Sequence, residues 1–412
     1  MFRVYEGQSV TRIDLTGNKI TKEYIIRREL KLTVGQPFRL ATLQGDITRL
    51  ENLAIFSSIL VIPTQETEGV ALEFNFREMP WILPSLSVGY TEQDGWSVGP
   101  AVAALNLLGR NIYLSANARF GGSTSYRLYF NYPWITWKHL STEMTASHII
   151  RNDKVLEFGE TSDEITPWVG MYLGRHGRLR CGFSYFKMHS DTEGITLSSD
   201  NTDNLYRLGV SLAWDTRDSW RNPREGWHNE WVGMRTGGWL GGDGDSWLGV
   251  YDLRRFQPLM PAQTLVLGGL VSMQSGEVGR ELPSYLQYFL GGSSSVRGYK
   301  TEELGKELFG KNQLIGTVEY HLLVQDLKEY RLLGLAFSLG LKLVAFTDVG
   351  LAWSRSEDFN WSRTAIGYGI GAHLLVPGVE VVRLDLGMSR RGDIVIHLAA
   401  RPKLEAQRYR LR

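Results

Sequence analysis

The stretch Val296-Arg297-Gly298-Tyr299 combines residue types suited to one specific polar contact. It directly follows GGSSS at 291–295, five small residues that predict a flexible segment without core-forming side chains. The planar guanidinium of Arg297 can bind one or two carboxylates in a bidentate way that lysine cannot reproduce. Gly298 permits backbone conformations that are closed to other residues. The pattern therefore predicts a loop that ends in a charge-assisted contact with a rigid partner.

A second polar stretch, DTRDSWRNPREG, occupies residues 215–226. The carboxylates of Asp215 and Asp218 can close Asx turns, while Pro223 fixes its own backbone dihedral angle. Gly226 can take a left-handed conformation at the end of such a turn. These residue types favour a structural role over a chemical one.

Few residues in the sequence are arranged for catalysis. HExxH, P-loop and GxSxG motifs are absent, and GYGIG at 367–371 lies in a predicted strand without the helix that a nucleotide loop needs. His373 or His397 could act as a base only beside a serine and a carboxylate, which the spacing does not supply. We therefore expect no catalytic residue, no metal site and no cofactor, and keep a lipid hydrolase only as a minor alternative.

The composition excludes several classes of protein. The 412 residues include 45 Lys and Arg against 44 Asp and Glu, so no basic field argues for a nucleic acid partner. The 45 glycines and an aromatic content of 11% favour many short strands. The single Cys181 excludes an intrachain disulfide framework, and no apolar run reaches the ~18 residues of a membrane-spanning helix. The opening MFRVYEGQSV lacks signal-peptide features, so either a signal has been removed or the chain is not exported by that route.

Two regions of different periodicity must position these stretches. The first region, residues 10–78, predicts a small α+β module in the order β-α-α-β-β. Its expected elements are a strand at 10–18, helices at 22–30 and 40–53, and strands at 57–65 and 70–78. Thr21 is expected to cap the first helix.

From Trp81 onward, apolar and polar residues alternate. In NIYLSANARF at 111–120, the even positions are apolar and the odd positions are polar or amphipathic. About 16 such segments of ~10 residues follow one another, which is the length that a membrane-spanning strand needs. Aromatic residues gather at segment ends, as in YPWITW at 132–137, which is typical of an interfacial girdle. A soluble sandwich or propeller would also alternate, but this persistence favours a transmembrane barrel.

Connections of alternating length predict the orientation of this barrel. Short links are expected at one end, at 107–111, 174–178 and 376–380. Longer links are expected at the other end, at 152–164, 191–204 and 276–311. Because outer-membrane barrels have short periplasmic turns and long outer loops, the N-terminal module is expected in the periplasm. Arg297 then lies in the longest outer loop.

Three stretches together carry a resemblance to a known family: GGSSSVRGY at 291–299, AWDTRDSWRNPREGW at 213–227 and FTDVG at 346–350. With the preceding module, they resemble the BamA-type family of outer-membrane assembly and translocation barrels, and the module looks like a POTRA domain. The resemblance covers nearly the whole chain, from Val10 to about Pro402. It implies an all-β membrane protein with a small α+β domain, namely a 16-stranded antiparallel transmembrane β-barrel preceded by one POTRA domain. We expect the POTRA domain at 1–78 and the barrel at 79–412, with strands ending near 402 and a basic tail at 403–412.

The resemblance also assigns roles to residues. In the family, the arginine of the V-R-G-F/Y loop turns back into the barrel and pairs with an acidic wall residue, which here matches Asp348. Alternation independently places Phe346 and Asp348 on one face of their strand, and Glu319 on the polar face of another. The motif that locks the loop then consists of Val296, Arg297, Gly298 and Tyr299. The lumen partners of the loop are Asp348, Glu319 and Phe346. The periplasmic turn motif consists of Asp215, Arg217, Asp218, Asn222, Pro223 and Gly226. Because the lumen is expected to be wet, losing the ion pair should cost nearer ~1 kcal/mol than the value of a buried pair. An ordinary ion pair with no part in function is the alternative interpretation.

The function implied by the resemblance is the insertion and folding of other β-barrel proteins in the outer membrane. The POTRA domain would receive unfolded clients, and the seam between the first and last strands would template them without covalent chemistry. Pro84 in the first strand and Gly392 in the last are expected to weaken this seam. Expected partners are unfolded outer-membrane clients, membrane lipid and accessory assembly proteins on the periplasmic side of a Gram-negative outer membrane. A polypeptide or lipid translocation pore of the same family, or a structural surface antigen, are the alternatives.

Overall fold

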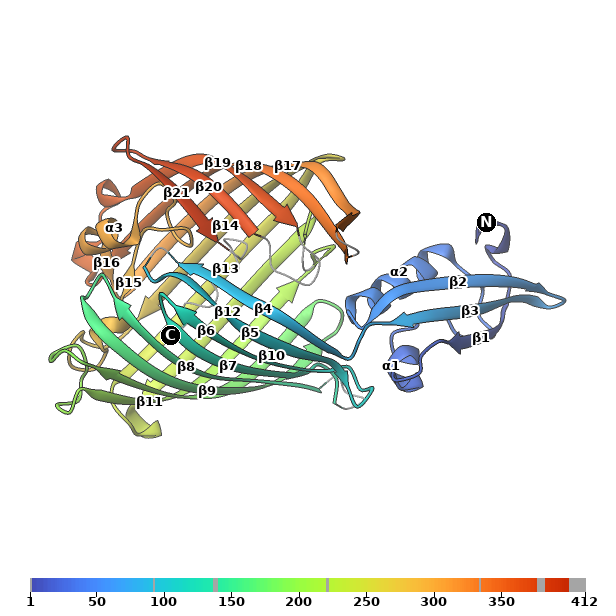
Figure 1. Cartoon of the computed structure of the whole chain (residues 1–412), viewed down its shortest axis with the longest axis horizontal. Helices are drawn as coiled ribbons and strands as arrows, with labels where there is room; N and C mark the ends of the chain where they lie inside the picture. The colour runs from blue at the N-terminus through green and yellow to red at the C-terminus, as the bar shows by residue number, and fades with distance from the viewer. Residues whose placement is uncertain are drawn as a thin grey trace.

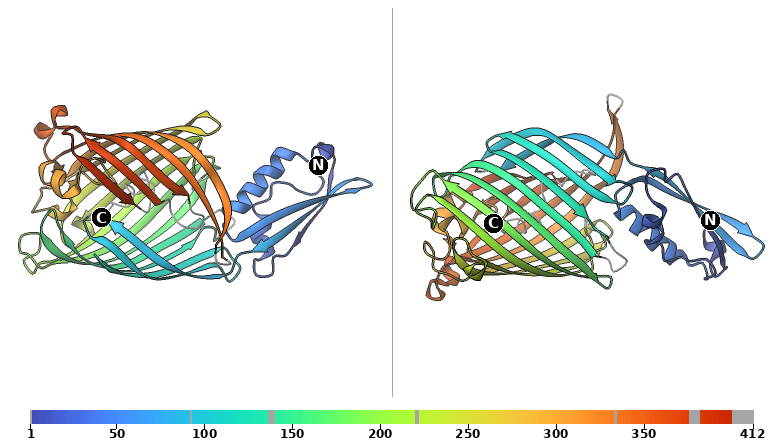
Figure 2. Two further views of the ribbon diagram at one scale, coloured as in Figure 1. Left: turned by 45° about the horizontal axis from the view of Figure 1, so that its top comes forward. Right: turned by 90° about the horizontal axis from the view of Figure 1, so that it is seen from below.

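The computed structural model describes residues 2–91, 93–135, 140–219, 222–332, 335–375 and 382–399. They form a small N-terminal domain and a large barrel of antiparallel strands, with the domain at one end of the barrel (Figure 1). Two further views show the same two-part shape, with the strands inclined around the barrel (Figure 2). Among the helices of this described part, none is long and apolar enough to cross a membrane.

The N-terminal domain has the predicted β-α-α-β-β order. Its sheet has the order β1 (Val10–Thr16), β3 (Gly69–Glu78) and β2 (Phe56–Glu66), with β1 parallel to β3. The helical elements are η1 (Phe2–Tyr5), α1 (Glu23–Arg27) and α2 (Leu40–Asn52). One apolar core joins the helices to the sheet, and its members include Ile26, Phe38, Leu50 and Phe74. β2 forms one edge of this sheet.

The first helix is shorter than predicted, and Thr21 does not cap it. α1 begins after Lys22, which makes no side-chain capping hydrogen bond. The Thr21 hydroxyl instead donates to Glu78 Oε1 at 2.5 Å, and the backbone N–H groups of Ile20 and Thr21 donate to the same carboxylate. Partial burial alone would raise the pKa of the Glu78 carboxyl, but these hydrogen bonds outweigh it and lower that pKa below its ordinary value.

The segment around α1 also joins the domain to the barrel. Asn106 Nδ2, at the end of β5 (Gly95–Leu107), donates to Thr21 Oγ1 at 2.8 Å. Arg28 donates to the backbone carbonyl of Trp134 at 3.3 Å, and its guanidinium lies 4.4 Å from the centre of the Trp134 ring. Asn106 lies at the end of β5 and Trp134 follows the end of β7 (Thr124–Tyr132), two strands that run in the same direction, so both contacts lie at one end of the barrel. The domain is therefore seated on the barrel through side chains as well as through the connecting chain.

The barrel sheet has 16 strands, which confirms the number predicted from the alternation. Each strand is antiparallel to its neighbours, and their order follows the chain, with β15 and β16 set apart in a loop. The strands are β4 (Ile82–Thr91), β5 (Gly95–Leu107), β6 (Ile112–Gly121), β7 (Thr124–Tyr132), β8 (Leu140–Asp153), β9 (Phe158–Leu173), β10 (Gly177–Ser190), β11 (Thr202–Asp215), β12 (Gly226–Gly237), β13 (Asp245–Met260), β14 (Gln263–Gln274), β17 (Asn312–Leu332), β18 (Leu335–Trp353), β19 (Ala365–Leu375), β20 (Val382–Ser389) and β21 (Ile394–Ala399). In β11, Ser211 is buried in the barrel whereas Leu212 and Trp214 are exposed outside it, so the polar face lines the lumen.

The two ends of the barrel sheet are not joined by a hydrogen-bonded ladder in the described part of the chain. β4 pairs with β5 alone and β21 pairs with β20 alone. Pro84 lies in β4, opposite Val102, as expected. Gly392 does not lie in the last strand; it forms the turn before β21, with a φ of +94° that favours glycine. The expected strand end near 402 and the tail at 403–412 lie outside the described residues.

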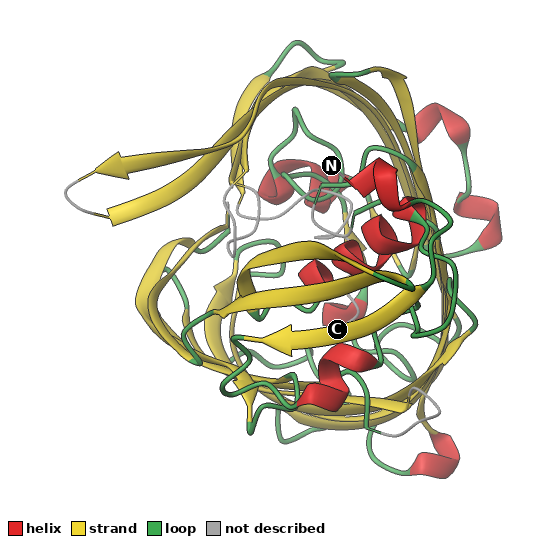
Figure 3. Cartoon of the chain, turned by 90° about the vertical axis from the view of Figure 1, so that its right-hand side faces the viewer, coloured by secondary structure: helices red, strands yellow, loops and turns green. Residues whose placement is uncertain are grey.

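One predicted long loop is wrong, and another has structure of its own. The link expected at 152–164 is a tight turn, because β8 runs to Asp153 and β9 begins at Phe158; the uniformly polar residues 160–164 hid the start of β9. The loop between β14 and β17 contains η3 (Ser284–Leu286), β15 (Tyr288–Phe289), α3 (Thr301–Glu307) and β16 (Phe309–Gly310). The hairpin of β17 and β18 projects outward from the barrel at the end nearest the N-terminal domain (Figure 3). The link expected at 376–380 lies outside the described residues.

Candidate functional site in the barrel lumen

The long loop between β14 and β17 folds into the lumen as a compact turn. The Ser295 hydroxyl accepts a hydrogen bond from the Gly291 N–H and donates to the Gly291 carbonyl, both at 2.7 Å. The Gly292 N–H donates to the Tyr299 carbonyl at 2.7 Å. The GGSSS segment therefore forms a closed turn that presents Arg297.

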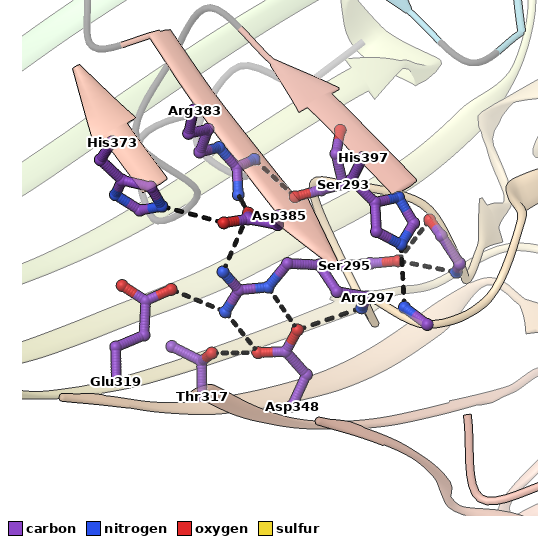
Figure 4. A network of polar contacts seen from close by, with 12 residues as sticks. Ser293, Ser295, Arg297, Thr317, Glu319, Asp348, His373, Arg383, Asp385 and His397 are labelled. Carbon is purple, nitrogen blue, oxygen red and sulfur yellow. Dashed lines mark hydrogen bonds and ion pairs between the residues drawn. The ribbon is translucent and has the colours of Figure 1, made fainter. Parts of the chain in front are cut away.

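Arg297 lies at the centre of a buried network of three carboxylates (Figure 4). Its Nε and Nη2 donate to the two oxygens of Asp348 at 2.8 and 3.0 Å, which is the bidentate geometry that suits a guanidinium. Nη2 also donates to Glu319 Oε1 at 2.6 Å, and Nη1 donates to Asp385 Oδ2 at 3.1 Å. The guanidinium carbon lies 3.5 Å from the centre of the Phe346 ring. One side chain thus connects β17, β18 and β20.

Further charged groups balance the carboxylates around Arg297. Asp385 accepts from Arg383 Nη1 at 2.9 Å and lies 3.0 Å from His373 Nε2. The Thr317 hydroxyl donates to Asp348. The sequence prediction missed Asp385, although Asp385 and Arg383 share the polar face of a clearly alternating strand. The alternation identified the face, but nothing in the sequence said that this strand would lie beside the loop.

Gly298 connects the loop to the last strand of the barrel. Its N–H donates to Nε2 of the buried His397 in β21 at 2.8 Å, so this ring nitrogen carries no proton in that contact. Gly298 has a φ of +94°, and a Cβ there would lie 2.5 Å from the Met388 carbonyl carbon. Glycine is therefore required both by the backbone conformation and by the close approach to β20.

Small residues of the wall form the surface against which the loop packs. A Cβ on Gly367 would lie 1.7 Å from the Arg297 carbonyl oxygen, and one on Gly387 would lie 2.4 Å from the Gly298 nitrogen. The GYGIG stretch is therefore part of β19, as predicted, and leaves room for the loop backbone. The Tyr299 hydroxyl donates to the Ile366 carbonyl of the same strand at 3.1 Å.

The wet lumen expected from sequence is wrong around Arg297. Arg297, Asp348 and Asp385 are each 0% exposed. An apolar cluster of the loop and the wall excludes water beside them, and its members include Leu290, Val296, Leu304, Ile315 and Leu351. A contact that breaks here leaves a charge without solvent, so its loss costs more than that of a surface ion pair.

The stretch DTRDSWRNPREG lies apart from this network, between β11 and β12 at the barrel end that carries the N-terminal domain. The Asp215 carboxylate accepts from Arg217 Nη2 at 2.6 Å, and Asp218 Oδ1 accepts from the backbone N–H of Arg224 at 2.9 Å. Asn222 and Pro223 follow in the same turn, which Gly226 ends with a φ of +112°. Its hydrogen bonds run within the turn, from the backbone N–H of Arg217 to Asp215 and from that of Asn222 to Ser219, so the stretch is a structural element.

Comparisons with known proteins agree with this architecture. The Omp85 superfamily domain is matched over residues 106–393, and a POTRA domain, described as a surface antigen variable number repeat, over residues 8–79. The outer membrane protein assembly factor BamA of Nitratidesulfovibrio vulgaris is 24% identical over 370 residues, which are 85% of this chain and 45% of that protein. BamA of Neisseria meningitidis is 25% identical over 400 residues, which are 88% of this chain and 49% of that protein. The chain therefore spans about half the length of these curated relatives.

Solved structures share the fold. BamA from Haemophilus ducreyi lacking POTRA domains 1–3 matches with a TM-score of 0.64 at 14% identity, covering 94% of this chain and 83% of that chain. CdiB from Escherichia coli matches with a TM-score of 0.63 at 15% identity, covering 96% of this chain and 74% of that chain. Because the superfamily domain extends over more than half of the sequence, and a POTRA domain precedes a 16-stranded barrel, the chain belongs to the Omp85 superfamily.

Proposed function

We propose that this protein is an outer-membrane assembly factor, which inserts and folds β-barrel clients with its N-terminal POTRA domain in the periplasm. The observation that carries the proposal is the seam between the two end strands: among the described residues, every neighbouring pair of strands in the barrel sheet shares a ladder, whereas β4 and β21 share none. Unpaired strand edges present free N–H and C=O groups to an incoming strand. A client strand can therefore be added to the barrel edge by β-augmentation.

The lumen loop supports this role by holding one side of the seam. The Val296-Arg297-Gly298-Tyr299 motif contacts the wall through Glu319 in β17, Asp348 in β18, Ile366 in β19, Asp385 in β20 and His397 in β21. These five strands are consecutive in the sheet and end at the seam. The loop would keep them in place as one unit while β4, on the other side, moves away to admit a client strand.

The edge strand of the POTRA domain is the proposed first contact for unfolded clients. Within the described part of the chain, β2 pairs with β3 on one side only, and its Leu60 and Ile62 side chains are 59% and 42% exposed. An extended client segment can pair with such an edge and place alternate apolar side chains against exposed ones. The contacts of Thr21 and Arg28 with the barrel would hold this edge in a fixed relation to the seam.

A translocation pore of the same superfamily is the competing proposal. The loop stands in its way, because a polypeptide passing through the lumen would have to displace the buried network around Arg297. The test is to reconstitute the full chain in liposomes and to follow both the folding of a second, denatured barrel protein and the ion conductance. Faster client folding without large conductance supports the assembly role. Large conductance without faster folding would overturn it.

A further inference from the structure

The hairpin of β17 and β18 continues beyond the wall of the barrel. β17 has 21 residues and β18 has 19, whereas a strand needs only ~9–11 residues to cross a bilayer. On one side, the Leu323 N–H donates to the Ala262 carbonyl at 2.8 Å, in the turn that precedes β14. On the other side, the described ladder between β18 and β19 ends at Gly340. In the described part of the chain, residues 324–332 and 335–339 therefore form a two-stranded side ribbon that pairs with no further strand.

The side ribbon points sideways from the barrel, at the end that carries the N-terminal domain. The view from below and the view from the side of that domain both show this direction (Figure 2 and Figure 3). The register of β17 against β18 shifts between Leu323 and Gln325 and again between Gln325 and Lys328, and each shift adds one residue to β17. Such bulges bend a strand. Because the barrel crosses the membrane, a ribbon that leaves it sideways at one end runs along the surface of the bilayer.

One face of the side ribbon continues the lipid-facing exterior of the barrel. Leu343 is exposed on that exterior, and Leu341 and Leu339 follow it on the same side of β18, since alternate residues of a strand share a face. Lys328 of β17 is the antiparallel partner of Leu339, and Tyr330 lies two residues further along the same side. Tyrosine and lysine combine an apolar stem with a polar end, as is typical of a membrane interface. When a strand bends outward, its exterior face lies inside the bend, so this face turns toward the bilayer.

Exposed apolar side chains on and beside the side ribbon favour a cover other than water. Val324 and Leu327 of the ribbon and Leu259 and Met260 at the end of β13 are each more than half exposed. The turn after β13 is hydrogen-bonded to the base of the ribbon, so these side chains extend the apolar exterior of the barrel. A two-stranded hairpin is at best marginally stable in water, so a surface that takes up these side chains also stabilises the ribbon.

The hydrocarbon interior of the bilayer does not fit the side ribbon either. Its edges carry backbone N–H and C=O groups without a described partner strand, and acyl chains cannot satisfy such groups. Asp326 and Lys328 are charged and exposed, which adds to the cost of leaving water. In the headgroup region, water and phosphates reach the edges while acyl chains cover the apolar face. That region therefore meets both requirements.

We propose that the side ribbon is a lateral membrane anchor, which binds the phospholipid headgroup region of the leaflet nearest the N-terminal domain, with Leu339 and Leu341 toward the acyl chains. Amphipathic elements at this interface bury their apolar face by ~5–10 Å. The ribbon is continuous with the strands that carry Glu319 and Asp348, two partners of Arg297, so it would fix the wall that holds the lumen loop to the membrane. The proposal does not depend on the assembly role, since it uses neither the seam nor the POTRA edge.

The test measures the depth of a nitroxide spin label by electron paramagnetic resonance, with the full chain in phospholipid nanodiscs. Single labels are attached through Leu339→Cys on the ribbon, Val318→Cys on the barrel exterior and Glu68→Cys in the turn between β2 and β3, in a Cys181→Ala background that removes the exposed native thiol. A label in lipid collides with oxygen, a label in water collides with a nickel chelate, and a label covered by protein collides with neither. We expect the label at 339 to lie ~5–10 Å below the headgroup surface, between the aqueous label at 68 and the deeper label at 318.

Matched variants tie this depth to the apolar side chains. Val324→Asp with Leu327→Asp should move the label at 339 into water, because two carboxylates replace apolar groups at the interface. Leu60→Asp with Ile62→Asp places the same charges on exposed positions of the N-terminal domain and should leave the depth unchanged.

Three results would overturn the proposal. Nickel access at 339 equal to that at 68 would place the ribbon in water. Exclusion of both reagents would show that a protein, such as a second copy of the chain, covers it. An unchanged depth in the folded Val324→Asp, Leu327→Asp variant would show that the apolar side chains do not hold the ribbon at the membrane.

Discussion

Replacing Arg297 with alanine should release the lumen loop while the barrel stays folded. The substitution leaves Asp348, Asp385 and Glu319 close together and buried without their shared cation. Removing one partner of a buried ion pair costs roughly 3–5 kcal/mol. We place the loss in this range, above the ~1 kcal/mol of a surface pair, because Arg297 is 0% exposed. The strand ladders do not involve this side chain, so the cost falls on the docked state of the loop.

Hydrogen exchange measures this cost directly. The backbone N–H groups of Arg297 and Gly298 donate to Asp348 Oδ2 and His397 Nε2, and exchange only when the loop leaves the wall. A loss of roughly 3–5 kcal/mol speeds their exchange by about a hundredfold to several thousandfold. Mass spectrometry of the peptide covering 291–300, in detergent or nanodiscs, gives the rate.

Two variants sharpen this experiment. Arg297→Lys should rescue little, because an ammonium keeps the charge but cannot bind the carboxylates with a planar fork. Arg280→Ala removes an arginine at an exposed loop position and should leave the exchange of 291–300 unchanged. Equal exchange rates in the unchanged protein and Arg297→Ala would refute the reasoning, since the network would then contribute nothing to holding the loop.

Gly367→Ala should also expel the loop, because its Cβ would lie 1.7 Å from the carbonyl oxygen of Arg297. A Cβ on Gly249 would meet no atom within 4 Å, so Gly249→Ala should leave the exchange rate of 291–300 unchanged. His397→Phe removes the acceptor for the loop N–H, and an unsatisfied buried donor costs ~1–3 kcal/mol, so exchange there should speed up by about fivefold to a hundredfold. His397→Gln, which keeps an acceptor, should recover part of this loss. The folded-state pKa of Glu78 is lowered, so its stabilising contacts are present above its ordinary pKa and are lost as the pH falls through the folded value. Glu78→Gln should therefore speed exchange at Thr21 near pH 7 and make progressively less difference as the pH falls below the ordinary value of 4.5, and an effect that does not change with pH would contradict this.

The alternation of apolar and polar residues was sufficient to predict most of the fold. A period of two, sustained from Trp81 onward, identified the barrel strands because one face meets lumen and the other meets an apolar exterior. It failed at residues 160–164, where β9 extends with polar residues on both faces. The predicted cap of the first helix was also wrong, because the Thr21 hydroxyl bonds to Glu78, a residue far along the chain, and the helix itself is shorter than expected.

Only part of the site could be predicted from the sequence. The positions of Asp348 and Glu319 on the lumen face followed from their strands, and the motif placed Arg297 in the loop. Asp385 and His397 could not be found in this way, because their contact with the loop depends on how five strands and a distant turn meet in space. The burial of the network was missed for the same reason: the loop itself excludes the water that an open barrel would hold.

The central claim is that the seam opens between β4 and β21, and a reducible crosslink across it tests this most directly. Val88 and Ile396 both face outward on these strands, with exposures of 46% and 65%. In a Cys181→Ala background, which removes the exposed native thiol, cysteines at both positions would be joined by a disulfide-containing bismaleimide. We predict that the joined protein fails to accelerate the folding of a client barrel in liposomes, and that a reducing agent restores its activity. Full activity of the joined protein would contradict seam opening.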